Sequence, residues 1–208
     1  MSHESFIVQY DHDTQRHGYS VYFSEGKRDS ATNYNHGKPD SLQFFYYGGI
    51  ISRIKSYDKG MNVGVEHFYD KRGKLKRVVF QAPEGGQARD LIYLTPEGKI
   101  ETVIQPCYVW QSATKGETGE QFATIISIPK VAGYSPGLRF EVIKNGAVIA
   151  SRQTAFTRQS ALSEDWIIQN SYDAPGAYTN RVHVTLKGEG LPDVQGLTEI
   201  QILVSRRI

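Results

Sequence analysis

Histidines are the first residues to consider for chemistry, because an imidazole ring titrates close to neutral pH and binds metals when it is neutral. The chain has six, at His3, His12, His17, His36, His67 and His183. Asp11-His12-Asp13 places two carboxylates around one imidazole, which would suit part of a metal site. A zinc site needs three or four converging ligands, and no second histidine stands at metal-binding spacing here. We therefore expect a solvated loop without a metal, and an exposed His67 on the strand face opposite Phe68.

Other residue types that could catalyse a reaction lack the arrangement that catalysis requires. Glycoside hydrolysis needs two carboxyl groups roughly 5–10 Å apart across a cleft, whereas the neighbours Glu164-Asp165 would point to opposite faces of a strand. No Gly-x-Ser-x-Gly motif is present. Cys107 has no thiolate-activating motif around it, so we expect a buried structural thiol. The sequence therefore predicts no catalytic residue, no cofactor and no enzyme.

Two further features could bind a ligand without catalysing a reaction. Trp110 and Trp166 could stack on a sugar, or they could fill a core, which is the commoner place for such rings. The run from Lys71 to Arg77 holds five positive charges around a glycine. It is either a solvated hairpin tip or a contact patch for an acidic partner or for anionic lipid headgroups.

Composition narrows the class of protein. The 208 residues contain 24 Lys and Arg against 22 Asp and Glu, so the net charge is +2 and no basic footprint for nucleic acid is present. One cysteine excludes an intrachain disulfide. No apolar run reaches the roughly 20 residues of a membrane helix. The first ten residues do not resemble a signal peptide, so we expect a cytoplasmic protein, or a periplasmic or secreted one if a leader has been removed.

An aromatic-glycine pattern returns at a nearly constant spacing in the first half of the chain. Paired aromatics occur every 23 residues, each followed by a glycine and then by another aromatic: Tyr22-Phe23, Gly26 and Tyr34; Phe45-Tyr46, Gly49 and Tyr57; Phe68-Tyr69, Gly73 and Phe80. This period predicts β-hairpins that pair side by side, with turns at the glycines. Gly64 to Tyr69, for example, would form a strand, Asp70 to Gly73 a turn, and Lys74 to Phe80 the returning strand. The recurrent rings would stack in one column.

The second half lacks the 23-residue pattern, and its sequence predicts about seven strands in a β-sandwich. The expected strands are 107–113, 121–128, 138–144, 147–156, 166–170, 178–186 and 198–204. Asn145-Gly146 between two apolar runs predicts a type I′ hairpin. The run from Asp173 to Tyr178 resembles the tyrosine corner of immunoglobulin-like domains, with one extra residue. We therefore expect an all-β chain with a hairpin-repeat domain over 1–105 and an immunoglobulin-like sandwich over 106–208.

The segment from Tyr57 to Leu75 resembles a MORN-type repeat. It has the pattern Tyr-x-x-Gly, a second glycine, a paired aromatic and Gly-Lys-Leu, and is closest to the bacterial YwqK-like antitoxin variant. The resemblance covers roughly residues 17 to 104. It implies a repetitive β-hairpin scaffold that binds a partner, and it brings no catalytic residue.

We therefore expect a non-enzymatic bacterial protein-binding protein, either an immunity or antitoxin-type neutraliser or an adaptor. Its partner would be another protein, such as a toxin or a secretion-system component. The alternatives are a glycan-binding module and a secreted effector component. An exposed edge strand would allow either dimerisation or capping by the sandwich. The expected contact residues are Tyr46, Tyr47, Tyr57, Tyr69, Lys71, Arg72, Lys74 and Lys76.

Overall fold

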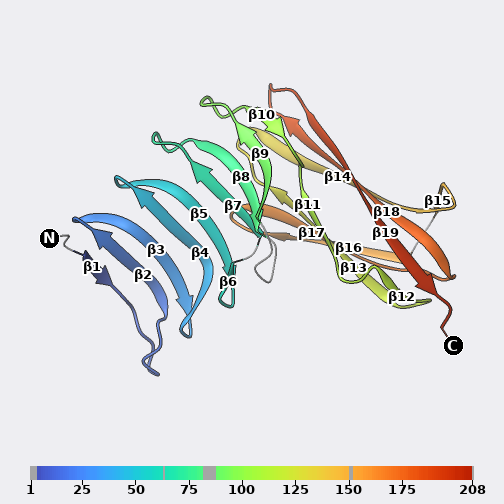
Figure 1. Cartoon of the computed structure of the whole chain (residues 1–208), viewed down its shortest axis with the longest axis horizontal. Coiled ribbons are helices and arrows are strands. Elements are labelled where there is room, and N and C mark those ends of the chain that lie inside the picture. Colours follow the sequence, from blue (N-terminus) through green and yellow to red (C-terminus); the bar gives the residue numbers. More distant parts are fainter. Residues whose placement is uncertain (1–3, 63, 82–87, 150–151, 208) are drawn as a thin grey trace. The chain divides into compact units, whose positions relative to one another are not determined.

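The computed structural model describes residues 4–62, 64–81, 88–149 and 152–207. All regular secondary structure within these ranges is β-strand (Figure 1). The all-β prediction is therefore confirmed. Two compact units divide the chain between Ile104 and Gln105. No helix in the described part of the chain is long and apolar enough to cross a lipid bilayer.

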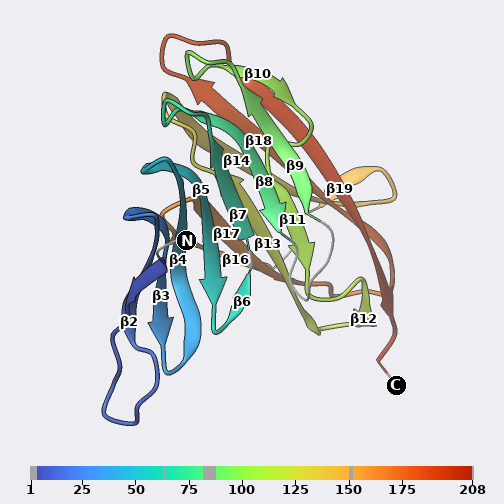
Figure 2. The same cartoon turned by 60° about the vertical axis from the view of Figure 1, so that its left-hand side comes forward.

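The first unit is a single antiparallel sheet in which nearly every strand pairs with the next one along the chain (Figures 1 and 2). Over the described residues its order is β1-β2-β3-β4-β5-β7-β8-β9-β10, and β6 pairs beside β5. Such a meander follows from turns too short to allow any crossover. The strands are β1 Glu4–Ile7, β2 Gly18–Ser24, β3 Lys27–Asn35, β4 Lys38–Tyr47, β5 Ile50–Asp58, β6 Met61–Asn62, β7 Gly64–Tyr69, β8 Leu75–Gln81, β9 Arg89–Leu94 and β10 Ile100–Val103.

The repeated glycines close the hairpins, as the sequence predicts. Both central residues of the β2–β3 turn, Glu25 and Gly26, have positive φ angles of 49° and 74°. This is the type I′ geometry that matches the twist of paired strands. In the β7–β8 turn, Gly73 donates its N–H to the Asp70 carbonyl over 3.0 Å. The predicted strand, turn and returning strand between Gly64 and Phe80 are confirmed.

Each aromatic pair coincides with a β-bulge. The register shifts between Tyr22 and Phe23, between Phe45 and Tyr46, and between Phe68 and Tyr69. A bulge inserts one extra residue into one of two paired strands and increases the local twist. The repeat therefore encodes a twisted hairpin end as well as a turn.

The prediction that the repeat aromatics stack on one another is wrong. Phe45, Arg53, Phe68 and Arg77 are consecutive cross-strand partners on β4, β5, β7 and β8. Rings 23 residues apart lie two strands apart, about 10 Å at the usual strand spacing, so the intervening strand places an arginine between them. The Arg53 guanidinium carbon lies 5.4 Å from the Phe45 ring centroid and 5.0 Å from that of Phe68. The row is a cation–π ladder and not a dry column of rings.

The opposite face of the sheet carries an apolar row. Ala31, Ile54, Val78 and Ile92 are buried and lie in one cross-strand register. His67 belongs to this row, on the face opposite Phe68 as expected, but it is 5% exposed. The predicted exposure of His67 is therefore wrong, because its ring lies in this row between the buried side chains of Ile54 and Val78.

The second unit consists of two sheets. One has the order β11-β13-β17-β16 and the other β12-β19-β18-β14-β15, with a parallel pairing between β12 and β19 alone among the described strands of this unit. The strands are β11 Tyr108–Gln111, β12 Lys115–Glu117, β13 Gln121–Pro129, β14 Tyr134–Lys144, β15 Ala147–Ile149, β16 Arg152–Gln159, β17 Ser163–Ser171, β18 Gly176–Gly188 and β19 Val194–Ser205.

Two features of this unit were not predicted from the sequence. The short strand β12 was not expected, and the single strand expected over 147–156 is two strands in different sheets. The hairpin at Asn145-Gly146 is confirmed, since both residues have positive φ angles, 52° and 78°, and β14 pairs with β15 across them.

Side chains from both sheets form the core of the second unit. Phe122 of β13 packs on Tyr172, whose ring centroid lies 4.3 Å from that of Tyr178 on β18. The Tyr178 hydroxyl donates to the Ala174 carbonyl over 2.6 Å, which is the hydrogen bond of a tyrosine corner. Cys107 is buried, as expected, and burial raises the pKa of its thiol to about 12.

Candidate functional site

A hollow of about 340 Å³ lies at the ends of two neighbouring hairpins of the first unit. The β4–β5 turn and the β7–β8 turn come together here because β5 pairs with β7, and Ile50 lies against Gly73 across the two turns. We call this hollow the hairpin-end groove. It is lined by Tyr47, Gly48, Ile50, Ile51, Ser52, Tyr69, Asp70, Lys71 and Lys76.

The groove exposes an apolar pair that would ordinarily be covered. Tyr47 and Ile50 are direct cross-strand partners on either side of the Gly48-Gly49 turn, and they are 72% and 43% exposed. Tyr69 lies half-buried at the wall of the groove, where burial raises the pKa of its phenol. The two side chains therefore place exposed apolar area beside a concavity, a feature that is common at interaction sites.

The charge around the groove is positive. Both carboxylate oxygens of Asp70 already accept hydrogen bonds. Oδ1 accepts from the backbone N–H groups of Arg72 and Lys74, each over 2.9 Å, and Oδ2 accepts from Arg72 Nε over 3.1 Å. These donors, the N–H of Lys74 first, hold the pKa of Asp70 below its usual value. Within the described residues Lys71, Lys74 and Lys76 have no ion pair, so the groove presents uncompensated ammonium groups.

The contact residues expected from the sequence divide into two groups. Tyr47, Tyr69, Lys71 and Lys76 line the groove, and Lys74 and Arg72 are exposed on the same turn. Tyr46 and Tyr57 are half-buried outside it, and burial raises the pKa of Tyr57. Sequence reasoning missed Ile50 and Ile51. The signal for them was an apolar pair directly after two glycines, since that position places both at a turn.

The two tryptophans cannot form a shared sugar platform. Trp110 pairs with Ile125, whereas Trp166 pairs with the next residue, Ile126. Neighbours on a strand point to opposite faces, so the two indoles lie on opposite faces of one sheet. Trp110 is 40% exposed, contrary to the core position considered for it, and Trp166 shares the face of the buried Ile126.

A second hollow, of about 550 Å³, crosses β14, β18 and β19 on the second unit, where Arg139 and His183 contribute to its lining. Two of its basic lining residues pair with one carboxylate of β14 beside it. Glu141 lies 2.7 Å from Arg139 Nη2 and 3.2 Å from His183 Nε2. This pairing does not single out an acid, a base or a nucleophile.

A third arrangement unites residues that the sequence did not combine. Asp11, His17 and His36 each place a possible ligand atom within 4.8 Å of the others. His12, the histidine considered with Asp11 from the sequence, is not part of this group, and its side chain is 84% exposed beside Asp13.

A scan against protein-family models and a search of curated protein sequences found no match to this chain.

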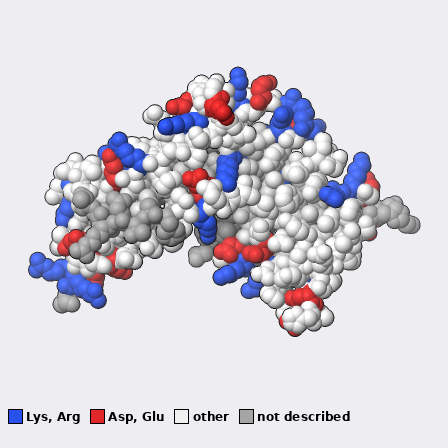
Figure 3. Space-filling model, turned by 180° about the vertical axis from the view of Figure 1, so that it is seen from behind, with Lys and Arg blue, Asp and Glu red and all other residues white. Residues whose placement is uncertain are grey.

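Charges of both signs are scattered over the face of the protein shown in Figure 3. Wide areas between them carry neither positive nor negative side chains.

Proposed function

We propose that this chain is a non-enzymatic bacterial protein-binding protein, an immunity or antitoxin-type neutraliser or an adaptor, whose MORN-like hairpin repeats hold an acidic segment of another protein. The hairpin-end groove is the observation that carries this proposal. It combines Tyr47, the most exposed of the described large hydrophobic residues, with Lys71 and Lys76, which form no ion pair with another described residue.

The chemistry of the groove defines the partner. Tyr47 and Ile50 offer apolar area at low entropic cost, because a tyrosine has few rotatable bonds. Lys71 and Lys76 would pair with carboxylates at the edge of that apolar area. The partner segment therefore carries one apolar or aromatic side chain flanked by Asp or Glu. Charge pairing at the rim mainly speeds association and weakens with salt.

The second unit has the strand arrangement of an immunoglobulin-like domain. Its two strand orders correspond to the A-B-E-D and G-F-C sheets of an immunoglobulin-like sandwich. The Tyr178 hydrogen bond to Ala174 supports the same interpretation. We propose an immunoglobulin-like domain on these grounds.

The test captures partners on the full chain at physiological salt and maps lysine cross-links by mass spectrometry. We expect cross-links at Lys71, Lys74 and Lys76. Capture should be lost with Tyr47→Ala, because an aromatic anchor at the centre of an interface contributes about 2 kcal/mol or more. Lys76→Glu should weaken capture and reduce its salt dependence, because Lys71 and Lys74 remain.

Tyr19→Ala is the matched control, since Tyr19 is a 51% exposed tyrosine of the same sheet that does not line the groove. It should capture the same partner as the wild type. Cross-links that map outside the groove, or equal capture by the Tyr47→Ala and Tyr19→Ala variants, would refute the proposed surface.

A further inference from the structure

The loop between β1 and β2 is folded back on itself and attached to the next turn of the sheet. Tyr10 and Arg16 form an isolated bridge, and the N–H of His17 donates to the Gln9 carbonyl over 3.0 Å. The N–H of Gly37, in the β3–β4 turn, donates to the Arg16 carbonyl over 2.9 Å. These backbone bonds bring the β3–β4 turn, 25 residues along the chain from Asp11, against the loop.

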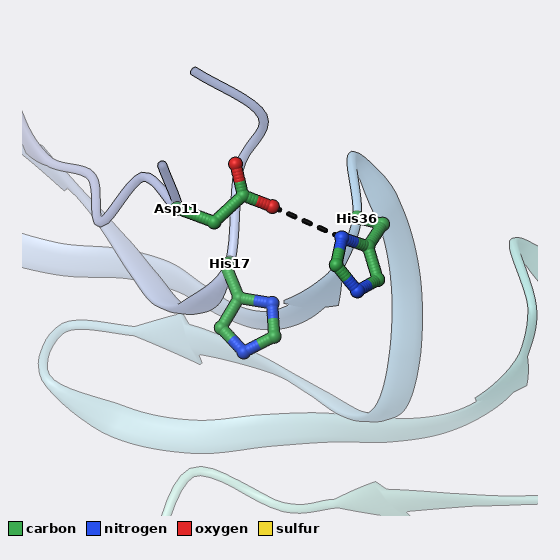
Figure 4. Close-up of side chains that lie close together, drawn as sticks. All are labelled: Asp11, His17 and His36. Carbon is green, nitrogen blue, oxygen red and sulfur yellow. Dashed lines mark hydrogen bonds and ion pairs between the residues drawn. The ribbon is translucent and has the colours of Figure 1, made fainter. Parts of the chain in front are cut away.

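Three side chains converge at this attachment (Figure 4). The Asp11 carboxylate and the rings of His17 and His36 turn toward a common space, with one ligand atom of each within 4.8 Å of the others. Asp11 Oδ2 lies 3.0 Å from His36 Nδ1, and the two ring centroids are 5.4 Å apart. Two imidazoles and one carboxylate therefore face one another from two separate segments.

From this geometry we propose that Asp11, His17 and His36 bind one divalent transition-metal ion of the zinc class, which fastens the loop before β2 to the β3–β4 turn.

Hydrogen bonds from the backbone hold the Asp11 carboxylate in a fixed orientation. Asp11 Oδ1 accepts the backbone N–H groups of Asp13 and Gln15 over 3.0 and 2.9 Å, which fixes the side chain and leaves Oδ2 directed at His36. These bonds, that of Gln15 first, lower the pKa of Asp11. The Asp11 side chain is 8% exposed, whereas that of His36 is 61% exposed, so an ion would enter from the histidine side.

The donor set fits the ion. Neutral imidazole suits zinc, copper, iron and nickel, and a carboxylate oxygen completes a two-nitrogen, one-oxygen set. Bonds of about 2.0–2.2 Å to a tetrahedral zinc ion place its ligands roughly 3.3–3.5 Å apart. The three possible ligand atoms lie within 4.8 Å of one another, so rotations of the two exposed imidazoles would have to close the remaining gap. Three protein ligands leave a fourth position for water.

A hydrogen bond alone accounts for only part of this arrangement. It explains why Asp11 and His36 lie together, but not why a second imidazole is placed beside them. Within the described residues the His17 ring has no hydrogen-bond partner, although it stands 5.4 Å from the His36 ring. A metal ion would give all three side chains a common partner.

The test titrates ZnCl₂ into tag-free, metal-stripped full chain by calorimetry and measures thermal unfolding with and without ZnCl₂. We expect one zinc ion per chain and a higher Tm with zinc, since an ion bound only by the folded state stabilises it. His17→Gln, His36→Asn and Asp11→Asn should each weaken binding at least about tenfold, because even outer-shell partners of a metal cost about 10–100-fold. Asparagine at position 36 also suits the positive φ of the turn, and asparagine at position 11 keeps the accepting oxygen.

His12→Gln is the matched control, because His12 lies in the same loop outside the cluster. It should bind zinc as the wild type does. Proton NMR of the unmutated chain provides a measurement that does not depend on any variant folding: zinc should shift the ring protons of His17 and His36. Equal affinity in the wild type and the ligand variants, or shifts at His12 or His183 in place of the cluster, would overturn the site.

This site and the hairpin-end groove are tested separately. β4 begins beside the His36-Gly37 turn and ends at Tyr47, so the two lie at opposite ends of one strand. Loss of zinc binding would leave Tyr47 and the lysines of the groove unchanged, and loss of partner capture in Tyr47→Ala would leave the metal ligands in place.

Discussion

Arg53 and Glu66 form an ion pair that joins two successive hairpins of the repeat sheet. Arg53 Nη2 and Nε lie 2.8 and 3.1 Å from the same oxygen, Glu66 Oε2, and Glu66 is 2% exposed. The other carboxylate oxygen accepts from Asn62 Nδ2 over 2.7 Å. Because the guanidinium also stands between the Phe45 and Phe68 rings, one side chain connects the buried charge to the cation–π ladder.

Replacing Arg53 should therefore destabilise the first unit strongly. Arg53→Met leaves the Glu66 carboxylate buried without its counter-ion, a change that costs about 3–5 kcal/mol for a fully buried pair. The Arg53 side chain is 32% exposed, so we expect a loss at the lower end of this range, about 3 kcal/mol in the free energy of unfolding, measured with urea. Adding Glu66→Leu should recover part of this loss, since both charges are then absent. Additive losses in the double variant would contradict the coupling.

Acid should weaken the second unit through Glu141. The hydrogen bond from His183, followed by the charges of nearby groups that include Arg139, lowers the pKa of Glu141 below its ordinary value of 4.5. A carboxyl group with a lowered folded-state pKa stabilises the fold above the unfolded value and loses that contribution as the pH falls through the folded value. Urea unfolding at about pH 5 and about pH 3 should show this loss in the wild type and a smaller one in Glu141→Gln. An identical loss in both would contradict the assignment.

Gly196 should tolerate no side chain. A Cβ built at this position on β19 overlaps the ring of Pro106, which is rigid and cannot swing aside. We expect Gly196→Ala to cost about 1–3 kcal/mol in unfolding free energy. Gly137→Ala on β14 is the control, because its Cβ would meet the nearest atom, the Thr185 carbonyl oxygen, at an ordinary 3.7 Å. Equal stability of the two variants would show that Pro106 moves freely.

The Cys107 thiol should be unreactive toward thiol reagents in the folded protein. Its thiol is buried and its pKa is raised to about 12, so almost no thiolate exists near neutral pH, and the thiolate is the reactive form. A thiol-reactive disulfide reagent at about pH 8 should react slowly with the native chain and rapidly in urea. Rapid reaction without denaturant would mean that the thiol is accessible and ionised.

Much of the local architecture can be predicted from the amino-acid sequence. The 23-residue spacing of aromatic pairs and glycines predicted hairpins and their turns, and Asn145-Gly146 predicted its own turn, because positive φ angles depend on the residues at the turn itself. The strand expected over 178–186 lies within β18, where the alternating residues Val182, Val184 and Leu186 are buried. These features depend on neighbours within a few residues.

The side-chain neighbours across strands were decided only by the tertiary structure. The bulges at Tyr22-Phe23, Phe45-Tyr46 and Phe68-Tyr69 shift the register, so a simple period of two does not give the facing residues, and Arg53 comes to stand where a ring was expected. Asp11 and His36 also meet only in the folded sheet, since a loop and a turn 25 residues apart touch only once the strands have paired. Contacts of this kind depend on strand register and loop closure, which arise from many weak pairings together and not from any single motif.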